Sequence, residues 1–180
     1  QRLHDHSITD SLHEYIASFD ERKLVAIMGG HGILRTEHIY RQVALLSKSL
    51  TEQGYLMLSG GGPGAMEATH LGAWMAGRGD NECLRAVGIL SAVPRYSDEG
   101  WLSSAFEVME RFPDPPFDSL GIPTWHYGHE LPTPFATKIA KYFENSIREE
   151  GLLAIAKGGV VFTPGSAGTL QEVFQDLAQN

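Results

Sequence analysis

Short apolar runs alternate with longer stretches of helical periodicity along this chain. The runs are bounded by glycine or other turn residues, as expected of buried strands, and they occupy 23–28, 55–58, 86–90 and 159–163. Apolar residues between them recur at helical spacing, which predicts helices over 36–53, 64–76, 99–111, 134–150 and 168–179. Strands that alternate with helices are typical of a parallel sheet. The pattern therefore predicts an α/β fold with a doubly wound parallel sheet and helices on both faces.

Two regions depart from this alternation. The segment 112–134 is rich in proline and turn residues, which predicts an ordered surface loop with a short strand at 124–127. An amphipathic pattern over 8–19 predicts a helix before the first strand. We therefore expect an N-terminal helical extension over 1–22 and one α/β domain over 23–180. Because such a domain usually adds a strand after its last helix, we expect it to be truncated at its C-terminal end, as a piece of a longer protein.

The amino-acid composition excludes several classes of protein for this chain. The chain of 180 residues, 42% of them hydrophobic, can bury one good core. A formal net charge of −8 argues against broad binding to nucleic acid backbones. The single cysteine, Cys83, excludes an intramolecular disulfide, and no apolar run reaches the ~18 residues needed to cross a bilayer. The first residues do not resemble a secretion signal. We expect a soluble cytoplasmic protein with no membrane partner, and nucleic acid is disfavoured as a partner.

The strongest chemical signal is a pair of glycine-rich turns, SGGGPGAMEA at 59–68 and PGSAGTLQE at 164–172. Each follows a predicted strand and leads into a predicted helix. Turns of this kind lie at the carboxyl ends of parallel strands, where free helix N–H groups favour an anion. Two of them in one small domain indicate a ligand that carries phosphate. The alternative is a tight connection between strand and helix that binds no ligand.

Neither turn matches the common cofactor motifs. Ala65 stands at the last position of the dinucleotide fingerprint, and no acidic residue ends the next predicted strand near Ile89. The chain also lacks the GxxxxGK[ST] spacing that places a lysine on the terminal phosphates of a nucleotide. We therefore expect no redox cofactor.

Together the two turns resemble the motifs of the LOG (Lonely Guy) family, often mislabelled lysine decarboxylase. The matching residues are Gly60-Gly61-Gly62-Pro63-Gly64-x-Met66-Glu67-Ala68, with Gly72-Ala73 after them, and Pro164-Gly165-x-x-Gly168-Thr169-x-x-Glu172. The resemblance spans 23–180 and implies a Rossmann-like nucleotide-binding domain, usually dimeric. Members are nucleoside 5′-monophosphate phosphoribohydrolases, which split the base from ribose 5-phosphate with water. Ser166 replaces the second glycine of the usual PGGxGTxxE motif, and its small side chain should preserve the turn.

Glu172 is the candidate catalytic residue. Cleavage of an N-glycosidic bond builds positive charge on the ribose ring, which a fixed carboxylate stabilises while it aligns or deprotonates the attacking water. Alternatively, Thr169 to Glu172 form a capping box, in which the glutamate only accepts a hydrogen bond from a free backbone N–H. The 5′-phosphate would bind to the turn and the helix N-terminus that precede Glu172, at Gly165, Ser166, Ala167, Gly168 and Thr169.

Arg148 corresponds most closely to the arginine of the family, although Glu149 follows it where the family has lysine. It would hold the ribose or phosphate through a bidentate fork, and a solvated helix face paired with Glu144 is the alternative. The first turn supplies the other candidates for substrate binding, which are Gly60, Gly61, Gly62, Gly64, Met66 and Glu67. Met66 could instead belong to the core, and Glu67 could be a first-turn partner of the helix dipole.

Histidine and aromatic residues give weaker signals. The segment WHYGH at 125–129 could stack on a base, or its rings could pack the proline-rich loop. His126 and His129 lack a clear third ligand, and His4, His6 and His13 fit a polar helix face, so we expect no metal. His31 could face the nucleotide or simply end a turn.

The two glycine-rich turns, taken with the family that they resemble, imply hydrolysis of nucleoside 5′-monophosphates without a cofactor. The resemblance implies a homodimer or higher homo-oligomer. A non-catalytic nucleotide sensor or carrier with the same pocket is the alternative. A DNA-binding relative is disfavoured by the acidic net charge, and a decarboxylase is disfavoured because no lysine stands in a recognisable pyridoxal phosphate setting.

Overall fold

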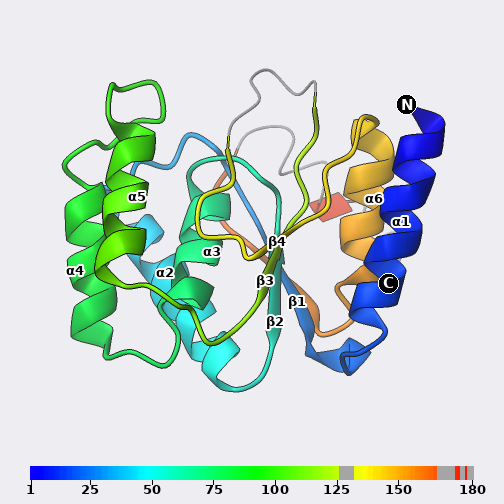
Figure 1. Ribbon diagram of the computed structural model, residues 1–180, viewed down its shortest axis with the longest axis horizontal. Coiled ribbons are helices and arrows are strands. Elements are labelled where there is room, and N and C mark those ends of the chain that lie inside the picture. Colours follow the sequence, from blue (N-terminus) through cyan, green and yellow to red (C-terminus); the bar gives the residue numbers. More distant parts are fainter. Residues whose placement is uncertain (126–131, 166–172, 175–176, 178–180) are drawn as a thin grey trace.

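A parallel sheet forms the middle layer of the protein, and helices pack on both of its faces (Figure 1). The computed structural model describes residues 1–125, 132–165, 173–174 and 177. Within these residues the sheet has five strands in the order β4-β3-β2-β1-β5, and all neighbouring pairs are parallel. The strands are β1 (Leu24–Met28), β2 (Leu56–Ser59), β3 (Ser119–Gly121), β4 (Lys138–Ile139) and β5 (Gly159–Phe162). The prediction of a doubly wound, Rossmann-like α/β fold is confirmed.

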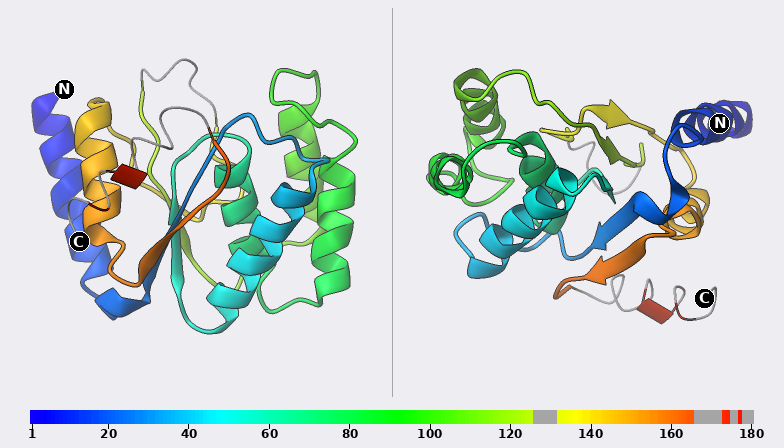
Figure 2. Two further views of the ribbon diagram at one scale, coloured as in Figure 1. Left: turned by 180° about the vertical axis from the view of Figure 1, so that it is seen from behind. Right: turned by 90° about the horizontal axis from the view of Figure 1, so that it is seen from below.

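The helices of the described residues form two groups, which the view from below in Figure 2 shows on opposite sides of the sheet. One group contains α2 (His38–Glu52), α3 (Ala65–Trp74), α4 (Asp80–Leu90) and α5 (Trp101–Arg111). The other contains α1 (Arg2–Ile16) and α6 (Asn145–Ile155), which lie side by side (Figures 1 and 2). A short 3-10 helix, Glu21–Lys23, leads into β1. None of the described helices is long and apolar enough to cross a membrane.

The sequence of β1 explains why both faces of the sheet are covered. Every residue of this strand is buried. Val25 and Ile27 pack into the core beside α2 and α3. Leu24, Ala26 and Met28 pack into the core beside α1 and α6. Because alternate strand residues point to opposite faces, a strand that is apolar throughout needs a helix layer on each side.

The strand predicted at 86–90 is wrong, because these residues form the second half of helix α4. The N-terminus of this helix is capped, since the backbone N–H of Gly79 donates to the Glu82 carboxylate at 3.0 Å. A short apolar run by itself does not distinguish a strand from one side of a helix. The buried residues of α4 repeat at i, i+3, i+4 and i+7 spacing: Cys83, Ala86, Val87 and Leu90.

The segment predicted as a loop, 112–134, instead supplies β3, which pairs with β2 inside the sheet. Beyond β3, the strand predicted at 124–127 is reduced in the described residues to an isolated bridge between Thr124 and Tyr142. The helix predicted over 134–150 is also wrong, because β4 precedes α6, which begins only at Asn145. Phe135 has a φ of 69° and is fully buried, so the backbone at the predicted start of that helix cannot be helical.

The remaining elements agree with the predictions to within a few residues. The glycine-bounded strands β1, β2 and β5 and the helices α2, α3 and α5 lie where the apolar pattern placed them. The helix predicted over 8–19 is α1, which begins earlier, at Arg2, and buries Leu12 in the core that it shares with α6. The helix predicted over 168–179 lies largely outside the described residues.

Candidate functional site

The sheet topology singles out the carboxyl ends of β1 and β5. From β1 the chain builds the sheet on one side, through β2, β3 and β4, and then returns to add β5 on the other side of β1. The strand order therefore reverses at β1, and Figure 2 shows β1 and β5 side by side. In open α/β sheets, ligands bind at such a switch point, in the crevice outside the carboxyl ends of the strands.

Two turns pack closely at this switch point. Gly29 and Gly30 follow β1, and the N–H of Gly30 donates to the Pro164 carbonyl of the turn after β5 at 3.3 Å. A Cβ added to Gly30 would lie 3.1 Å from the Gly165 Cα. A Cβ added to Gly29 would lie only 1.8 Å from Thr163 Oγ1. The packing therefore requires glycine at position 29 and leaves bare backbone at the switch point.

The glycine-rich turn after β2 joins the same group. Gly64 has a φ of 71°, and a Cβ there would lie 2.4 Å from the Gly30 carbonyl oxygen. The N–H of Ala65, the first residue of α3, donates to the same carbonyl at 3.4 Å. Only glycine occupies position 64 without strain. The turns after β1, β2 and β5 thus meet at one edge of the sheet.

The three consecutive glycines after β2 pack against Met66 and Pro123. A Cβ would lie 2.5 Å from the Met66 sulfur at Gly60, and 2.6 Å from the Met66 Cε at Gly62. A Cβ at Gly61 would lie 2.3 Å from the Cβ of Pro123, which follows β3. A side chain at Gly61 would collide with the rigid Pro123 ring, whereas at Gly60 or Gly62 the flexible end of Met66 would have to move. The half-buried Met66 therefore packs on the turn, and its contact with a base or ribose stays a prediction.

Arg148 reaches this edge of the sheet from α6. It is only 9% exposed, and its Nη1 would lie 3.7 Å from a Cβ at Gly60. Its Nη2 donates to Asn145 Oδ1 at 2.7 Å and lies 3.8 Å from the Glu149 carboxylate. The solvated helix face considered from the sequence is therefore wrong. The structure brings Arg148 and the first glycine-rich turn together.

A buried histidine on α3 supports the same turn. The His70 Nε2 lies 3.2 Å from the Gly60 carbonyl oxygen, and Nδ1 lies 3.1 Å from Ser119 Oγ. Because a carbonyl only accepts, Nε2 carries the proton and Nδ1 accepts from the hydroxyl. Burial lowers the pKa of His70 to about 4, so the ring is neutral at neutral pH. His70 thus fixes the Gly60 carbonyl and links the turn to β3.

Glu67, on the first turn of α3, is held in a buried network. Its carboxylate accepts hydrogen bonds at 2.9 Å from Arg35 Nε and from the Tyr40 hydroxyl. Arg35 and Glu67 also form an ion pair, in which neither side chain is more than 1% exposed. Burial and the negative charge of Glu67 raise the pKa of Tyr40 well above its usual value. Protein groups therefore hold Glu67 in place, and its contact with a ribose stays a prediction.

Arg35 is a residue that sequence reasoning missed. Its Nη1 donates to the carbonyls of Val93 and Trp101 at 3.2 and 3.1 Å, and to Ser104 Oγ at 2.8 Å. The guanidinium also lies 4.6 Å from the centre of the Trp101 ring. The acceptors of Arg35 lie 32 to 69 positions further along the chain, so no local pattern marks this residue.

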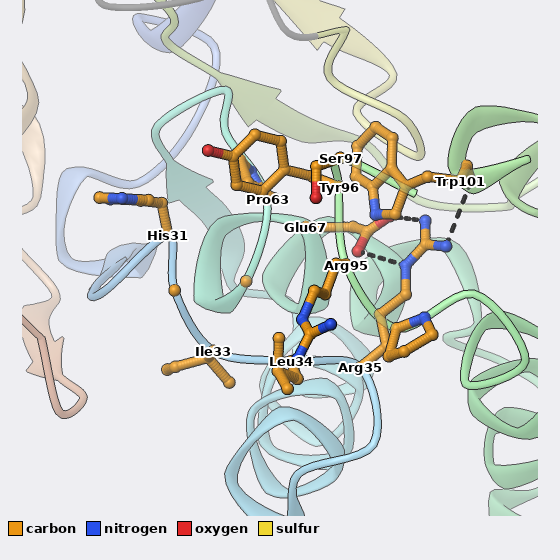
Figure 3. Close-up of a pocket in the computed structure, with 13 residues that line it drawn as sticks. His31, Ile33, Leu34, Arg35, Pro63, Glu67, Arg95, Tyr96, Ser97 and Trp101 are labelled. Atoms are coloured by element: carbon orange, nitrogen blue, oxygen red, sulfur yellow. Dashed lines mark hydrogen bonds and ion pairs between the residues drawn. The ribbon is translucent and has the colours of Figure 1, made fainter. Parts of the chain in front are cut away.

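A cleft of about 100 Å³ opens beside this network (Figure 3). Pro63, Tyr96 and Trp101 contribute apolar surface to it, and Arg95 contributes a cation. Gly64 lines the cleft and also packs on Gly30, so the cleft adjoins the glycine turns. Arg95 gives the cleft a cation that suits an anionic group. Tyr96 and Arg95 are exposed residues of the loop between α4 and α5, which the sequence did not single out.

Part of the predicted site lies outside the described residues. Gly165 and Trp125 are described, and Trp125 stacks on Phe143 with 5.7 Å between ring centroids. In the described part of the chain, no group of three or more His, Cys, Asp or Glu side chains could hold a metal ion. The predicted residues that lie outside the described ranges are Ser166, Ala167, Gly168, Thr169, Glu172, His126 and His129.

No protein-family model matches the chain, and no curated protein matches it. Among solved structures, the protein is similar to the X-ray structure of TM1055, a target of the Northeast Structural Genomics Consortium. The similarity covers 87% of this chain and 69% of that chain, with a TM-score of 0.54 and 21% sequence identity. This likeness shows a distant structural relationship and a common fold.

Proposed function

We propose that this protein hydrolyses the N-glycosidic bond of nucleoside 5′-monophosphates, as members of the LOG family that it resembles do. One observation carries the proposal: three glycine turns and the buried Arg148 converge at the carboxyl edge of the sheet. Backbone N–H groups and a guanidinium fork are the donors that bind phosphate groups and orient a nucleotide. The resemblance of both glycine motifs to the family supports the reaction, and it also supports a homodimer.

In this proposal the 5′-phosphate binds at the turn that begins with Pro164 and Gly165. The positive end of a helix contributes only ~0.3 to 2 kcal/mol to the binding of an anion, so a cationic side chain is a useful addition. Arg148 supplies it, because its planar fork can hold the ribose or the phosphate through two hydrogen bonds. The phosphate then acts as an anchor that sets the sugar against the catalytic carboxylate.

The bond that breaks joins C1′ of the ribose to a nitrogen of the base. Positive charge develops on the ribose ring as this bond lengthens, and the carboxylate of Glu172 stabilises it. The same carboxylate takes a proton from the attacking water, whose oxygen forms the new bond to C1′. The base leaves with the electron pair of the broken bond and takes up a proton. The products are the free base and ribose 5-phosphate, and the scheme uses no cofactor.

The test is to incubate the protein with AMP, GMP, CMP and UMP and to measure the released base by chromatography. We expect release from at least one nucleotide, and far slower release from the matching nucleoside, which lacks the anchoring phosphate. Calorimetry on the same samples measures binding. Binding without base release would contradict hydrolysis and would support a nucleotide sensor or carrier that uses the same pocket. If the protein neither binds a nucleotide nor releases a base, both functions are contradicted.

A further inference from the structure

Asp5, on the first turn of α1, is buried although it carries a charge. It is 2% exposed, and its two carboxylate oxygens accept hydrogen bonds from the backbone N–H groups of Phe143 at 2.9 Å and Glu144 at 3.0 Å. These two residues immediately precede α6. Burial of a carboxylate is costly unless it is paired with donors such as these. A side chain from the start of the chain therefore holds the amino end of α6.

The amino end of α6 has no cap of its own. Its N-cap residue, Glu144, makes no side-chain capping hydrogen bond. The free N–H groups and the positive end of a helix favour an anion at this place. Burial alone would raise the pKa of Asp5, but hydrogen bonds from Phe143, His4 and Glu144 outweigh it and hold the pKa below its usual value. Asp5 is therefore charged at neutral pH and remains an acceptor for both N–H groups.

Further contacts tie the start of α1 to the same segment. The Thr9 hydroxyl donates to the Asp5 carbonyl at 2.9 Å and lies 3.3 Å from the Tyr142 hydroxyl oxygen. The His4 and Phe143 rings pack edge to face with 4.8 Å between their centroids. Figures 1 and 2 show α1 and α6 side by side. The segment that leads into α6 is thus held by one surface of α1.

This junction is one helical turn away from Arg148. The Arg148 backbone N–H donates to the Glu144 carbonyl at 3.2 Å, and its Nη2 donates to Asn145 Oδ1 at 2.7 Å. Asp5 holds the N–H of Glu144, the residue whose carbonyl accepts from the Arg148 backbone N–H and which directly precedes Asn145. The other end of this chain of contacts is the glycine turn, where Arg148 Nη1 would lie 3.7 Å from a Cβ at Gly60.

We propose that Asp5 is a positioning residue for Arg148. It fixes the amino end of α6 and thereby keeps the guanidinium against the first glycine-rich turn. The inference rests on the proposed function, in which Arg148 orients the mononucleotide. A misplacement of about 1 Å at an active site can cost roughly a hundredfold in rate, so a support of this kind affects turnover as well as stability.

The test is a double-mutant cycle of Asp5→Asn and Arg148→Lys, measured by kcat/KM for base release. Asparagine keeps the shape of the aspartate, but it replaces one acceptor oxygen by an NH2 group that would face a backbone N–H. We expect Asp5→Asn alone to lower kcat/KM up to roughly tenfold, and to have an effect below about threefold in the Arg148→Lys background. Effects that multiply independently would overturn the inference, because they would show that Asp5 does not act through Arg148.

The matched control is Asp10→Asn on the same helix. The Asp10 side chain is 68% exposed and pairs with His6 at the surface, so kcat/KM should stay unchanged. Thr9→Val is a milder variant for use if Asp5→Asn does not fold, since it removes the hydroxyl near Tyr142 and keeps the carboxylate. It should lower kcat/KM severalfold with the same dependence on Arg148, and an unchanged or independent kcat/KM would contradict the inference.

A second readout does not depend on activity. The Nε–H resonance of Arg148 in NMR spectra should shift in Asp5→Asn, or in Thr9→Val as its substitute, and should not shift in Asp10→Asn. If the unaltered protein releases no base but this resonance shifts as expected, the proposed function fails while the positioning role stands. If the resonance stays unchanged in the variant that folds, the positioning role fails whatever the activity of the protein.

Discussion

Two buried arginines, which lie on opposite sides of the sheet beside α2 and on α6, differ in the groups that their guanidinium nitrogens contact. Arg35, just before α2, is 1% exposed and donates from Nε, Nη1 and Nη2 to protein acceptors, among them the Glu67 carboxylate. Arg148, on α6, is 9% exposed and lies against bare backbone at Gly60, with Asn145 accepting from its Nη2. Both are charged, buried and close to the glycine-rich turn after β2.

The comparison teaches that burial of a charge does not by itself mark a functional residue. Arg35 joins the turn after β1 to α3 and to the loop before α5, so its contacts stabilise one arrangement of three segments. Arg148 faces the edge of the sheet where the topology favours a ligand. Changes at the Arg35 network should therefore affect stability, and changes at the Arg148 edge should affect binding and turnover.

The largest effect is expected on the functional side, from Glu172→Gln. Glutamine neither stabilises positive charge on the ribose nor accepts a proton from water, so kcat should fall by roughly 10² to 10⁴. The free energy of unfolding should change by no more than about 1 kcal/mol, since at most a helix cap is altered. Steady-state base release and urea unfolding measure the two quantities. If activity persists, Glu172 is only the last residue of a capping box.

On the structural side, Glu67→Gln should lower the free energy of unfolding by about 3 to 5 kcal/mol, because it leaves the Arg35 guanidinium buried without its counter-charge. Glu107→Gln is the control, since Glu107 pairs with Arg111 on the surface of α5 with a side chain 47% exposed. That change should cost less than about 1 kcal/mol. Urea unfolding compares both variants. A stable but inactive Glu67→Gln protein would show that Glu67 acts in substrate binding or turnover and not in stability.

The contrast between the two arginines also explains which parts of the candidate site can be predicted from the sequence. Local patterns predicted the glycine turns, because a strand, its turn and its helix are contiguous. Contacts between distant segments left no local signal: Glu67 is 32 positions from Arg35, and Phe143 is 138 positions from Asp5. The sequence therefore indicated which backbone would surround a ligand and suggested Arg148, but it missed Arg35 and Asp5.

The fold shows the same limit in two elements. The residues at 86–90 read as a strand because one side of a short helix contains as many apolar residues as a buried strand. β3 was missed because Ser119, Leu120 and Gly121 lie among prolines and make a run too short to recognise. Their burial comes from pairing with β2 on one side and β4 on the other, which is a tertiary effect.

His70 lies on α3, the same helix as Glu67, and contacts the Gly60 carbonyl. Its titration should make the stability of the protein depend on pH. Its pKa is about 4 in the folded protein against 6.5 as the usual value. The unfolded chain therefore takes up a proton as the pH falls below about 6.5, while the folded protein does so only near pH 4. Stability is fully present above pH 6.5 and about 3 kcal/mol of it is lost as the pH falls to 4.

The measurement is urea unfolding from pH 4 to 7 for the unaltered protein and for His70→Gln, whose amide can still donate to the Gly60 carbonyl. The difference in free energy of unfolding between the two should shrink as the pH falls, because glutamine does not titrate. Curves that stay parallel over this range would show that His70 is not held neutral by burial.

The smallest effects come from making the same change at both arginines. Lysine keeps the charge but loses the planar fork. Arg148→Lys should raise KM for the nucleotide roughly tenfold, equivalent to one charged hydrogen bond, and lower the free energy of unfolding by no more than about 1 kcal/mol. Arg35→Lys should lower the free energy of unfolding by about 1 to 3 kcal/mol and leave KM unchanged in the folded protein. If both substitutions reduce only stability, then Arg148 is structural like Arg35, and the proposed nucleotide site loses its orienting cation.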